Sequence, residues 1–299
     1  MQRPVKIAYV TDRGFLGPTL VSAWSLQENL SGPAELHFWG NGLQEDDWAT
    51  VRRVVSKNPQ LDLICKDISS GYLEGAYGPQ DYISAATMGR LFIPSLIDGY
   101  VLYIDGDTLV TGNVARLFEL DIGDAYAGVV RDYTVTHWLA DRKGLTQARA
   151  TRLSEIGAFM HPTPPSDYFN AGVMLFNCDA IRAEPELLKR VCDVAEASAR
   201  SHGDQDHLNA LFHEKLVQLD PVWNASWGRL GKHRKHLSRC GARAEGAMPG
   251  NTEILHYHGP EKPWRDARAG LLSSRGRATL IYRRALRRFG EQYPELMPI

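Results

Sequence analysis

The stretch Tyr100-Val101-Leu102-Tyr103-Ile104-Asp105-Gly106-Asp107 sets two carboxylates directly after a run of apolar residues. Such a run is typical of a buried strand, so the carboxylates emerge at its carboxyl end, where open α/β sheets bind ligands. Gly106 permits a sharp bend, which lets both acids point at one divalent cation. Asp-Gly between apolar runs is also a hairpin signal, and both interpretations stay open at this point.

A second polar segment, His256-Tyr257-His258-Gly259-Pro260-Glu261-Lys262-Pro263-Trp264, follows the apolar pair Ile254-Leu255. Neutral imidazole is a common ligand of transition ions, so we expect His256 to complete a metal site with the two aspartates. Lys262 is suited to neutralise a phosphate as a compact point charge. Each residue alone is more often an ordinary surface or core residue, and the combination carries the prediction.

These segments resemble glycosyltransferase family 8, the retaining, metal-dependent nucleotide-sugar transferases that include bacterial lipopolysaccharide galactosyltransferases and glycogenin. The segment from His256 is similar to the family's His-x-x-Gly-x-x-Lys-Pro-Trp signature. Five ordered motifs over roughly residues 5–265 are far harder to match by chance than one. The other four resemble the first strand with its uracil-binding turn, a helix ending in Arg-Leu, a Phe-Asn-Ala-Gly segment and an Asp-Gln-Asp-x-Leu-Asn segment: Ile7–Asp12, Ser84–Leu91, Tyr168–Val173 and Asp204–Asn209.

The resemblance implies a fold and an activity. The fold is α/β, a single GT-A-type nucleotide-sugar-binding domain with a mainly parallel central sheet over residues 1–264, followed by a basic C-terminal helical tail over residues 265–299. The activity moves a hexose, galactose or glucose, from a UDP-sugar to an acceptor hydroxyl, with Mn²⁺ or Mg²⁺ bridging the diphosphate. The acceptor is a carbohydrate, a glycolipid or a small metabolite. A non-catalytic sugar-nucleotide-binding protein and a metal-dependent nucleotidyltransferase are the alternatives.

The resemblance also implies roles for particular residues. Asp105, Asp107 and His256 hold the metal, and Gln205 and Asp204 take part in catalysis. Because the neutral amide of Gln205 is a weak nucleophile, we favour front-face attack over double displacement. The donor is bound by Val10, Asp12, Arg90, Asp105, Gly106, Asn170, Ala171, Asp204, Gln205, Gly259 and Lys262.

Several of these positions have an ordinary structural interpretation as well. Asp12 is placed to accept a hydrogen bond from a uracil N–H, but aspartate also commonly caps a turn. The following Arg13-Gly14 departs from the more polar residues that the family often has there. Arg90 is equally suited to a structural ion pair, and Asp204 to a helix N-cap.

Composition agrees with a folded enzyme. The chain has 299 residues, of which 43% are hydrophobic, and a formal net charge of −1. These values exclude a disordered chain and give no basic field for nucleic acid. The four cysteines form no Cys-x-x-Cys pair, and no apolar stretch approaches the roughly 20 residues of a membrane span, so we expect a cytoplasmic protein. The dinucleotide fingerprint and the phosphate-binding loop are absent from the sequence.

Apolar periodicity predicts alternating strands and helices in the first part of the chain. The region Tyr133–Asp167 is expected to be irregular because of its prolines, with one small exposed helix at Ala140–Ile156. We expect this region to border the acceptor site. The predicted strands are Lys6–Asp12, Glu35–Gly40, Leu61–Ile68, Tyr100–Ile104 and Phe169–Asn177, and the predicted helices are Leu16–Leu30, Glu45–Lys57, Ala180–Arg200 with a kink at Pro185, and Asp204–Lys215.

The tail has a composition of its own. Between Arg265 and Arg288 there are eight arginines and one acid, interleaved with apolar residues such as Leu280, Ile281 and Phe289. This pattern is typical of a basic amphipathic helix. Such a helix either packs its apolar side on the core or lies on an anionic membrane surface. We favour packing, with a peripheral contact at the inner face of the membrane as the alternative.

Overall fold

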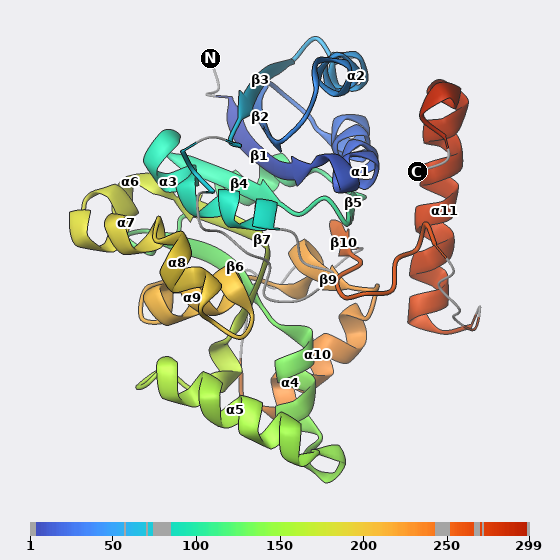
Figure 1. The fold of residues 1–299 in the computed structure, drawn as a ribbon. Helices are drawn as coiled ribbons and strands as arrows, with labels where there is room; N and C mark the ends of the chain where they lie inside the picture. Colours follow the sequence, from blue (N-terminus) through green and yellow to red (C-terminus); the bar gives the residue numbers. More distant parts are fainter. Residues whose placement is uncertain are drawn as a thin grey trace.

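The computed structural model describes residues 4–56, 58–69, 71–73, 85–242, 252–265, 270 and 272–297. Within them a seven-stranded sheet forms the centre of the molecule, in the order β3-β2-β1-β4-β7-β6-β8 (Figure 1). All neighbours pair in parallel except β7, which is antiparallel to β4 and to β6. The predicted α/β fold with a mainly parallel sheet is therefore confirmed. The strands are β1 Val5–Asp12, β2 Ala34–Asn41, β3 Leu61–Asp67, β4 Tyr100–Ile104, β6 Ala127–Arg131, β7 Phe169–Asn177 and β8 Leu216–Gln218.

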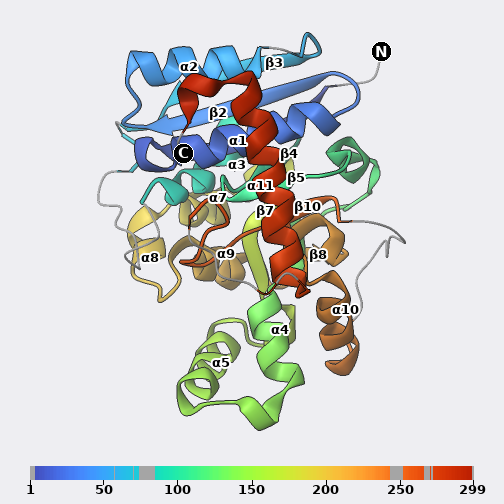
Figure 2. The same cartoon turned by 90° about the vertical axis from the view of Figure 1, so that its right-hand side faces the viewer.

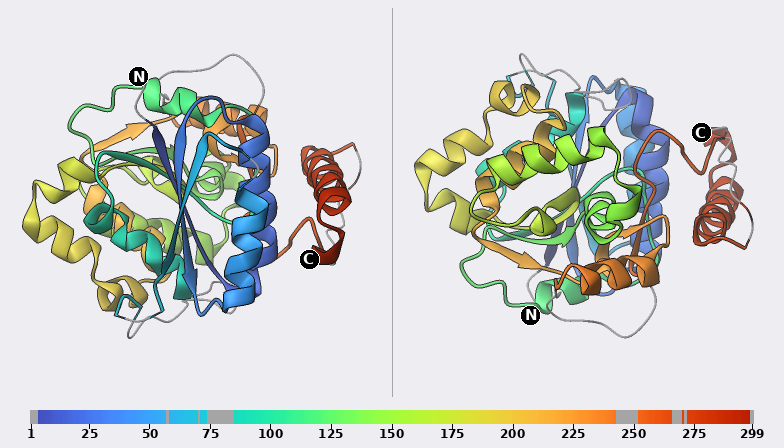
Figure 3. Two further views of the ribbon diagram at one scale, coloured as in Figure 1. Left: turned by 90° about the horizontal axis from the view of Figure 1, so that it is seen from above. Right: turned by 90° about the horizontal axis from the view of Figure 1, so that it is seen from below.

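Helices cover both faces of this sheet (Figure 3). Because side chains of a strand alternate between faces, Ile7 and Tyr9 of β1 join the core with α1 and α2, whereas Ala8 and Val10 join the opposite core. The first face carries α1 Leu16–Asn29 and α2 Glu45–Val55, and the second carries α3 Ile93–Leu96, α6 Cys178–Arg182, α7 Pro185–Val191, α8 Val194–Ser198 and α9 Gly203–Phe212. Short 3₁₀ turns lie at Arg13–Phe15, Ala85–Phe92, Val114–Glu119, Arg142–Gly144, Pro165–Asp167, Pro221–Asn224 and Pro294–Leu296.

A second, three-stranded sheet stands beside the first. It consists of β5 Thr108–Val110, β10 Ile254–His256 and β9 Ala225–Ser226, with β10 in the middle. In its register His256 lies opposite Thr108 on one side and beside Ser226 on the other. This pairing carries His256 to the aspartates that follow β4, over a large separation in sequence.

The region Tyr133–Asp167 corrects our prediction of an irregular segment. It contains two helices, α4 Tyr133–Ala140 and α5 Gln147–Phe159, so the small helix expected at Ala140–Ile156 is shifted. The carboxylate of Asp132 begins α4 by accepting from the backbone N–H groups of Thr134 and Val135. Thr146 caps α5 in the same way through Arg149 N. Two N-capped helices therefore occupy a region for which we predicted one helix and irregular chain.

The predicted helix Ala180–Arg200 was also wrong, because the segment forms three short helices, α6, α7 and α8. Asn177 caps the first by accepting from Ala180 N. Pro185 opens the second, where its missing N–H costs nothing, and Asp193 caps the third. Where we predicted a kink at Pro185, the structure has a complete break between α6 and α7. The other predicted strands and helices agree with the structure within a few residues, although Lys57 and Ser84 lie outside the described residues.

Helix α11, Ser274–Gln292, crosses the outer side of α1 (Figure 2). Its inner residues Tyr282 and Phe289 are fully buried, and the Phe289 ring lies 5.9 Å from that of Trp24 on α1. The outward side chains Leu280 and Ile281 are 38% and 42% exposed. The described part of the tail is therefore a docked helix, as we favoured, and the domain boundary after residue 264 stays a prediction.

One more helix completes the described chain. Helix α10, Leu230–Arg239, packs against α4 at the same end of the molecule as α5 (Figures 1 and 2). None of the helices in the described ranges combines the length and the apolar character that crossing a membrane requires.

Candidate active site

A cavity of about 650 Å³ opens at the carboxyl ends of β1 and β4. Asp12 ends the first of these strands, and Asp105 directly follows the second. The amino end of β7 reaches the same edge because β7 runs antiparallel, and it contributes Asn170. The start of α9 and the loop after β10 close the site with Gln205 and Lys262.

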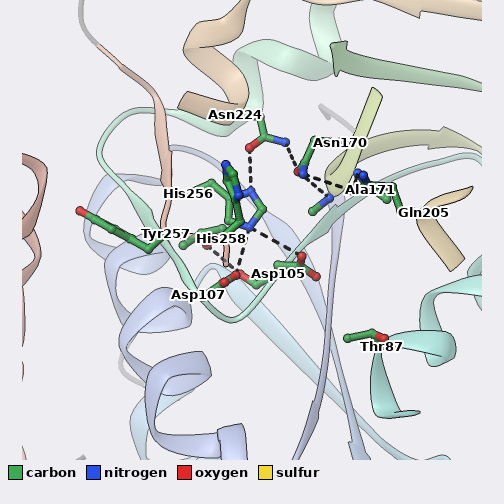
Figure 4. A network of polar contacts seen from close by, with 12 residues as sticks. Thr87, Asp105, Asp107, Asn170, Ala171, Gln205, Asn224, His256, Tyr257 and His258 are labelled. Atoms are coloured by element: carbon green, nitrogen blue, oxygen red, sulfur yellow. Dashed lines mark hydrogen bonds and ion pairs between the residues drawn. The ribbon is translucent and has the colours of Figure 1, made fainter. Parts of the chain in front are cut away.

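The two aspartates and the histidine come together in this cavity (Figure 4). Asp105, Asp107 and His256 each offer a ligand atom, and these atoms lie within 4.8 Å of one another. His256 Nε2 is 3.1 Å from Asp107 Oδ1 and 3.8 Å from Asp105 Oδ2. Two carboxylates and an imidazole are a donor set that fits Mn²⁺ or a similar divalent ion.

The orientation of His256 also fits a metal ligand. Its Nδ1 lies 2.8 Å from Asn224 Oδ1, while the amide nitrogen of Asn224 donates to Asn170 Oδ1 at 2.9 Å. Since Asn224 therefore presents its oxygen to the ring, Nδ1 carries the hydrogen. With a metal ion bound, the lone pair of Nε2 would face the ion, as in metal sites where a neighbouring oxygen fixes the histidine tautomer.

Asp107 is held as an anion by its neighbours. Burial raises the pKa of Asp107, but Lys262 and His256 together outweigh burial and bring this pKa well below its usual range. Lys262 Nζ lies 2.6 Å from Asp107 Oδ2. The Asp107 carboxylate is thus charged at neutral pH, and the ammonium group of Lys262 lies directly beside the cluster.

Arg90 and Asp204 form a buried ion pair behind the cluster. Arg90 Nε lies 2.7 Å from Asp204 Oδ2, and Arg90 Nη2 lies 3.2 Å from Asp105 Oδ1. Burial lowers the pKa of Arg90, but Asp105 and Asp204 more than reverse this effect. Burial raises the pKa of Asp204, against the effect of Arg90. Arg90 is therefore neutralised by two carboxylates, and its contribution to donor binding stays a prediction.

An amide network joins β7 to α9. Asn170 Oδ1 accepts from Gly172 N at 3.1 Å, and its Nδ2 donates to Asp132 Oδ2 and to Gln205 Oε1, each at 3.2 Å. Gln205 Oε1 also accepts from the backbone N–H of Ala171 at 3.1 Å. These bonds fix both amides relative to the cluster, so the cavity has a rigid polar wall.

Almost all the residues that we predicted for the site line this one cavity, Val10 and Gly259 included. Ala171 does not line it, and takes part through its backbone, whose N–H donates to Gln205 Oε1 and whose carbonyl accepts from Arg90 Nη1. One oxygen of Asp12 caps the turn Arg13–Phe15 by accepting from Phe15 N at 2.9 Å. The capping interpretation of Asp12 therefore holds for that oxygen, and its role toward uracil stays a prediction.

Sequence reasoning missed several residues of the cavity and of its support. Asp132 directly follows β6, just as Asp105 follows β4, and this pattern was available to find it. Tyr168 is the first residue of the segment Tyr168–Val173 that we quoted, but we gave it no role of its own. Asn224 carries no local signal, because its partner His256 is distant in sequence. The other lining residues that we did not predict include Phe15, Thr87, Trp138, Arg152, Ile156 and His202.

Comparison with known proteins agrees with this geometry. A model of glycosyl transferase family 8 matches residues 6–268, so the chain belongs to this family. It is similar to glycosyltransferase GlyE of Streptococcus pneumoniae serotype 4, at 29% identity over 76% of this chain and 49% of that protein. General stress protein A of Bacillus subtilis is 28% identical over 61% of this chain and 60% of that protein. The chain thus matches about half to three-fifths of the length of these relatives.

Solved structures show the same fold. Galactosyltransferase LgtC in complex with donor and acceptor sugar analogues superposes with a TM-score of 0.71 at 22% identity, covering 94% of this chain and 95% of that one. The apo structure of the bifunctional glycosyltransferase WbbM gives a TM-score of 0.69 at 18% identity, over 96% of this chain and 52% of that one. The predicted GT-A fold is confirmed by these likenesses.

Proposed function

We propose that this chain transfers a hexose, galactose or glucose, from a UDP-sugar to an acceptor hydroxyl with retention of configuration. The observation that carries the proposal is the convergence of Asp105, Asp107 and His256 beside Lys262 in the cavity at the sheet edge. A diphosphate leaving group develops negative charge as the glycosidic bond breaks. A site for that chemistry needs positive charge where the diphosphate lies.

Asp105, Asp107 and His256 would hold the divalent ion, which supplies Lewis-acid stabilisation of the diphosphate when bound. Lys262 adds a second positive charge beside Asp107. We expect Mn²⁺ to serve at least as well as Mg²⁺, since an imidazole ligand suits the softer ion. The nucleoside lies toward Val10 and Asp12, at the β1 side of the cavity.

The donor sugar faces the polar wall that Asn170, Asp204 and Gln205 form. A buried carboxylate such as Asp204 discriminates between hydroxyl configurations, because a mismatched sugar leaves it unpaired. The acceptor hydroxyl attacks on the side from which the diphosphate departs, and the departing diphosphate takes its proton. The role of the protein in this step is to hold the two substrates in line for the attack.

The acceptor lies against α4 and α5. Trp138 of α4 and Ile156 of α5 line the cavity, together with Val135. The volume of about 650 Å³ lies within the range of pockets that enclose small ligands. An indole beside aliphatic groups suits the apolar face of a sugar ring, so we propose a carbohydrate acceptor, free or as part of a glycolipid.

The test is release of UDP from a panel of UDP-sugars with Mn²⁺, in wild type, Asp107→Asn and Asp124→Asn. Asp124 is an exposed carboxylate and serves as the matched control. We expect slow, chelator-sensitive release in wild type and Asp124→Asn, and its loss in Asp107→Asn. Chelator-resistant release by Asp107→Asn would contradict the proposal. Pyrophosphate exchange would indicate a nucleotidyltransferase, and binding without turnover a non-catalytic module.

A membrane contact is the last part of the proposal. The outer face of α11 exposes Leu280 and Ile281 between several arginines, among them Arg277 and Arg284. This combination suits an anionic lipid surface, to which basic side chains are attracted. A contact there would bring a glycolipid acceptor to the enzyme without involving the buried side of the helix.

A further inference from the structure

The amide of Gln205 is held with its oxygen in a determined position. A backbone N–H can only donate, so the Gln205 atom 3.1 Å from Ala171 N must be the oxygen. Asn170 Nδ2 donates to the same atom at 3.2 Å. Both lone pairs of Oε1 are therefore engaged in hydrogen bonds within the protein.

The nitrogen of the Gln205 amide is also held in a determined position, by a chain of hydrogen bonds that begins at Asp206 and runs through Tyr168. Asp206 accepts at both oxygens, from the Arg152 guanidinium at Oδ1 and from His202 N at Oδ2, 3.0 Å away. Tyr168 therefore donates its hydroxyl hydrogen to Asp206 Oδ1, at 2.7 Å. Burial, followed by the charge of Asp206, raises the pKa of Tyr168 well above its ordinary value, so the hydroxyl keeps that hydrogen.

The oxygen of Tyr168 then has only lone pairs to offer to the amide. It accepts one hydrogen of Gln205 Nε2 at 2.9 Å. The direction of every hydrogen bond from Asp206 to Gln205 is thus fixed by groups that can act in one way only. Tyr168 and Asp206 are 2% and 1% exposed, so water does not compete for these bonds.

We propose that Gln205 presents a hydrogen-bond donor to the donor sugar, through the Nε2 hydrogen that Tyr168 does not take. Gln205 lines the cavity, where that hydrogen meets an oxygen of the ligand. Tyr168 and Asp206 are positioning residues, which fix the polarity of the amide. The inference rests on the proposed function only for the identity of the ligand as a UDP-sugar.

This polarity bears directly on the reaction. The oxygen is the nucleophilic atom of an amide, and in Gln205 it is turned toward β7 and occupied by two donors. Attack by Gln205 on the anomeric carbon would require both bonds to break. An N–H donor instead stabilises negative charge or lone pairs on an oxygen of the sugar, which agrees with front-face attack by the acceptor.

The first experiment needs no ligand. Tyr168→Phe removes only the hydroxyl that holds the amide, and Tyr126→Phe is its matched control, since Tyr126 donates to Glu184 at 2.7 Å and does not line the cavity. The readout is the pair of side-chain amide NMR signals of Gln205, assigned by their loss in Gln205→Ala. We expect slowed hydrogen exchange at one of the two amide hydrogens in wild type and Tyr126→Phe, and its loss in Tyr168→Phe. Unchanged signals in Tyr168→Phe would overturn the positioning role.

The second experiment measures binding of UDP-galactose, UDP-glucose and their deoxy and deoxyfluoro analogues by calorimetry. Fluorine can accept a hydrogen bond but cannot donate one, whereas hydrogen does neither. At the position that faces Gln205 we expect the fluoro analogue to bind more tightly than the deoxy analogue in wild type, and equally in Gln205→Ala. Equal binding of the two analogues at every position of the sugar would overturn the donor role.

Kinetics separate positioning from a loss of folding. We expect Tyr168→Phe to lower kcat about tenfold, with a smaller change in KM for the UDP-sugar, because one hydrogen bond is lost. An unchanged kcat in Tyr168→Phe would contradict the positioning role. If no UDP-sugar binds to wild type, the proposed function fails, and the amide signals still decide whether Tyr168 fixes Gln205.

Discussion

Gly172 lies so close to His256 that a Cβ on the glycine would stand 2.2 Å from His256 Cε1 and 2.6 Å from Asp105 Oδ2. The backbone of β7 therefore forms the floor of the Asp-Asp-His cluster. The backbone carbonyl of Gly172 also accepts from Asp105 N at 2.8 Å. Only a residue without a side chain fits between the ring and the carboxylate.

This contact predicts that Gly172→Ala loses the metal site while the sheet is retained. The new methyl group displaces the His256 ring or the Asp105 carboxylate, at a cost of about 1–3 kcal/mol for overpacking. We expect Mn²⁺-dependent thermal protection by UDP to disappear. Gly128→Ala on β6 is the control, since the three atoms nearest to its Cβ all belong to the flexible side chain of Leu219, at 3.3 Å or more. Protection of Gly172→Ala equal to that of wild type would contradict the predicted metal site.

The bond between Asn224 and His256 gives a second prediction. Asn224→Ala removes the oxygen that orients the imidazole, and partners of this kind are typically worth 10- to 100-fold in metal affinity. We expect the affinity for Mn²⁺ in the presence of UDP to fall by about this factor, as measured by calorimetry. Asn29→Ala, remote from the cavity, should leave it unchanged. An unaltered affinity in Asn224→Ala would mean that His256 is not a ligand.

The buried environment of His233 predicts that the stability of the fold decreases in acid. It lies on α10 and faces α4, and within the described residues neither ring nitrogen has a hydrogen-bond partner. Burial lowers the pKa of His233 to about 4, and the charged groups that face the imidazole change this pKa by smaller amounts. These come from Asp132, His236, Arg229 and Arg131, and the ring of Tyr133 packs against the imidazole.

The direction in which stability changes with pH follows from the pKa values of His233 in the folded and the unfolded chain. In the unfolded chain His233 has a pKa of about 6.5, so as pH falls the unfolded chain takes up the proton before the folded one does. The contribution of His233 to the free energy of unfolding is therefore complete above about pH 6.5 and is lost as pH falls toward about 4. At pH 5 the loss from this residue is about 2 kcal/mol. We expect urea unfolding at pH 7 and pH 5 to show a smaller loss in His233→Phe than in wild type or in His161→Phe, an exposed control. Equal acid sensitivity of all three proteins would refute the prediction.

The strands and the metal cluster could be predicted because their signals are local. Tyr100–Ile104 is a short apolar run, and its carboxyl end fixes where Asp105 must emerge. The helix α4 was missed because prolines farther along the region dominated the interpretation. Its actual start depends on the carboxylate of Asp132, which caps it.

The supporting residues could not be predicted because tertiary pairing creates their contacts. The separation between Asn224 and His256 is 32 residues, and the pairing of β9 with β10 brings them together. Tyr168 and Asp206 are 38 residues apart. A motif names the residues on each segment, but the register between segments decides which side chains meet.

The packing of α11 predicts a large loss of stability for a substitution on its buried side and almost none for a substitution on its exposed side. Phe289 is fully buried against Trp24, whereas Ile281 is 42% exposed on the same helix. We expect Phe289→Ala to lower the free energy of unfolding by about 3–5 kcal/mol. Ile281→Ala should change it by less than about 0.5 kcal/mol, as surface substitutions usually do. Urea unfolding of both variants checks the packing, and similar small effects would show that the helix is not docked in solution.

The exposed side of α11 gives the last prediction, binding of the whole chain to vesicles that contain anionic lipid. Arginine side chains near such a surface contribute about 1 kcal/mol each, and salt screens this attraction within a Debye length. We expect sedimentation with anionic vesicles at low salt, its loss at high salt, and no binding to neutral vesicles. The double variant Leu280→Ser, Ile281→Ser should weaken binding with an unchanged melting temperature, because both side chains are exposed. Binding that resists salt, or that the double variant leaves unaltered, would exclude this face as the membrane contact.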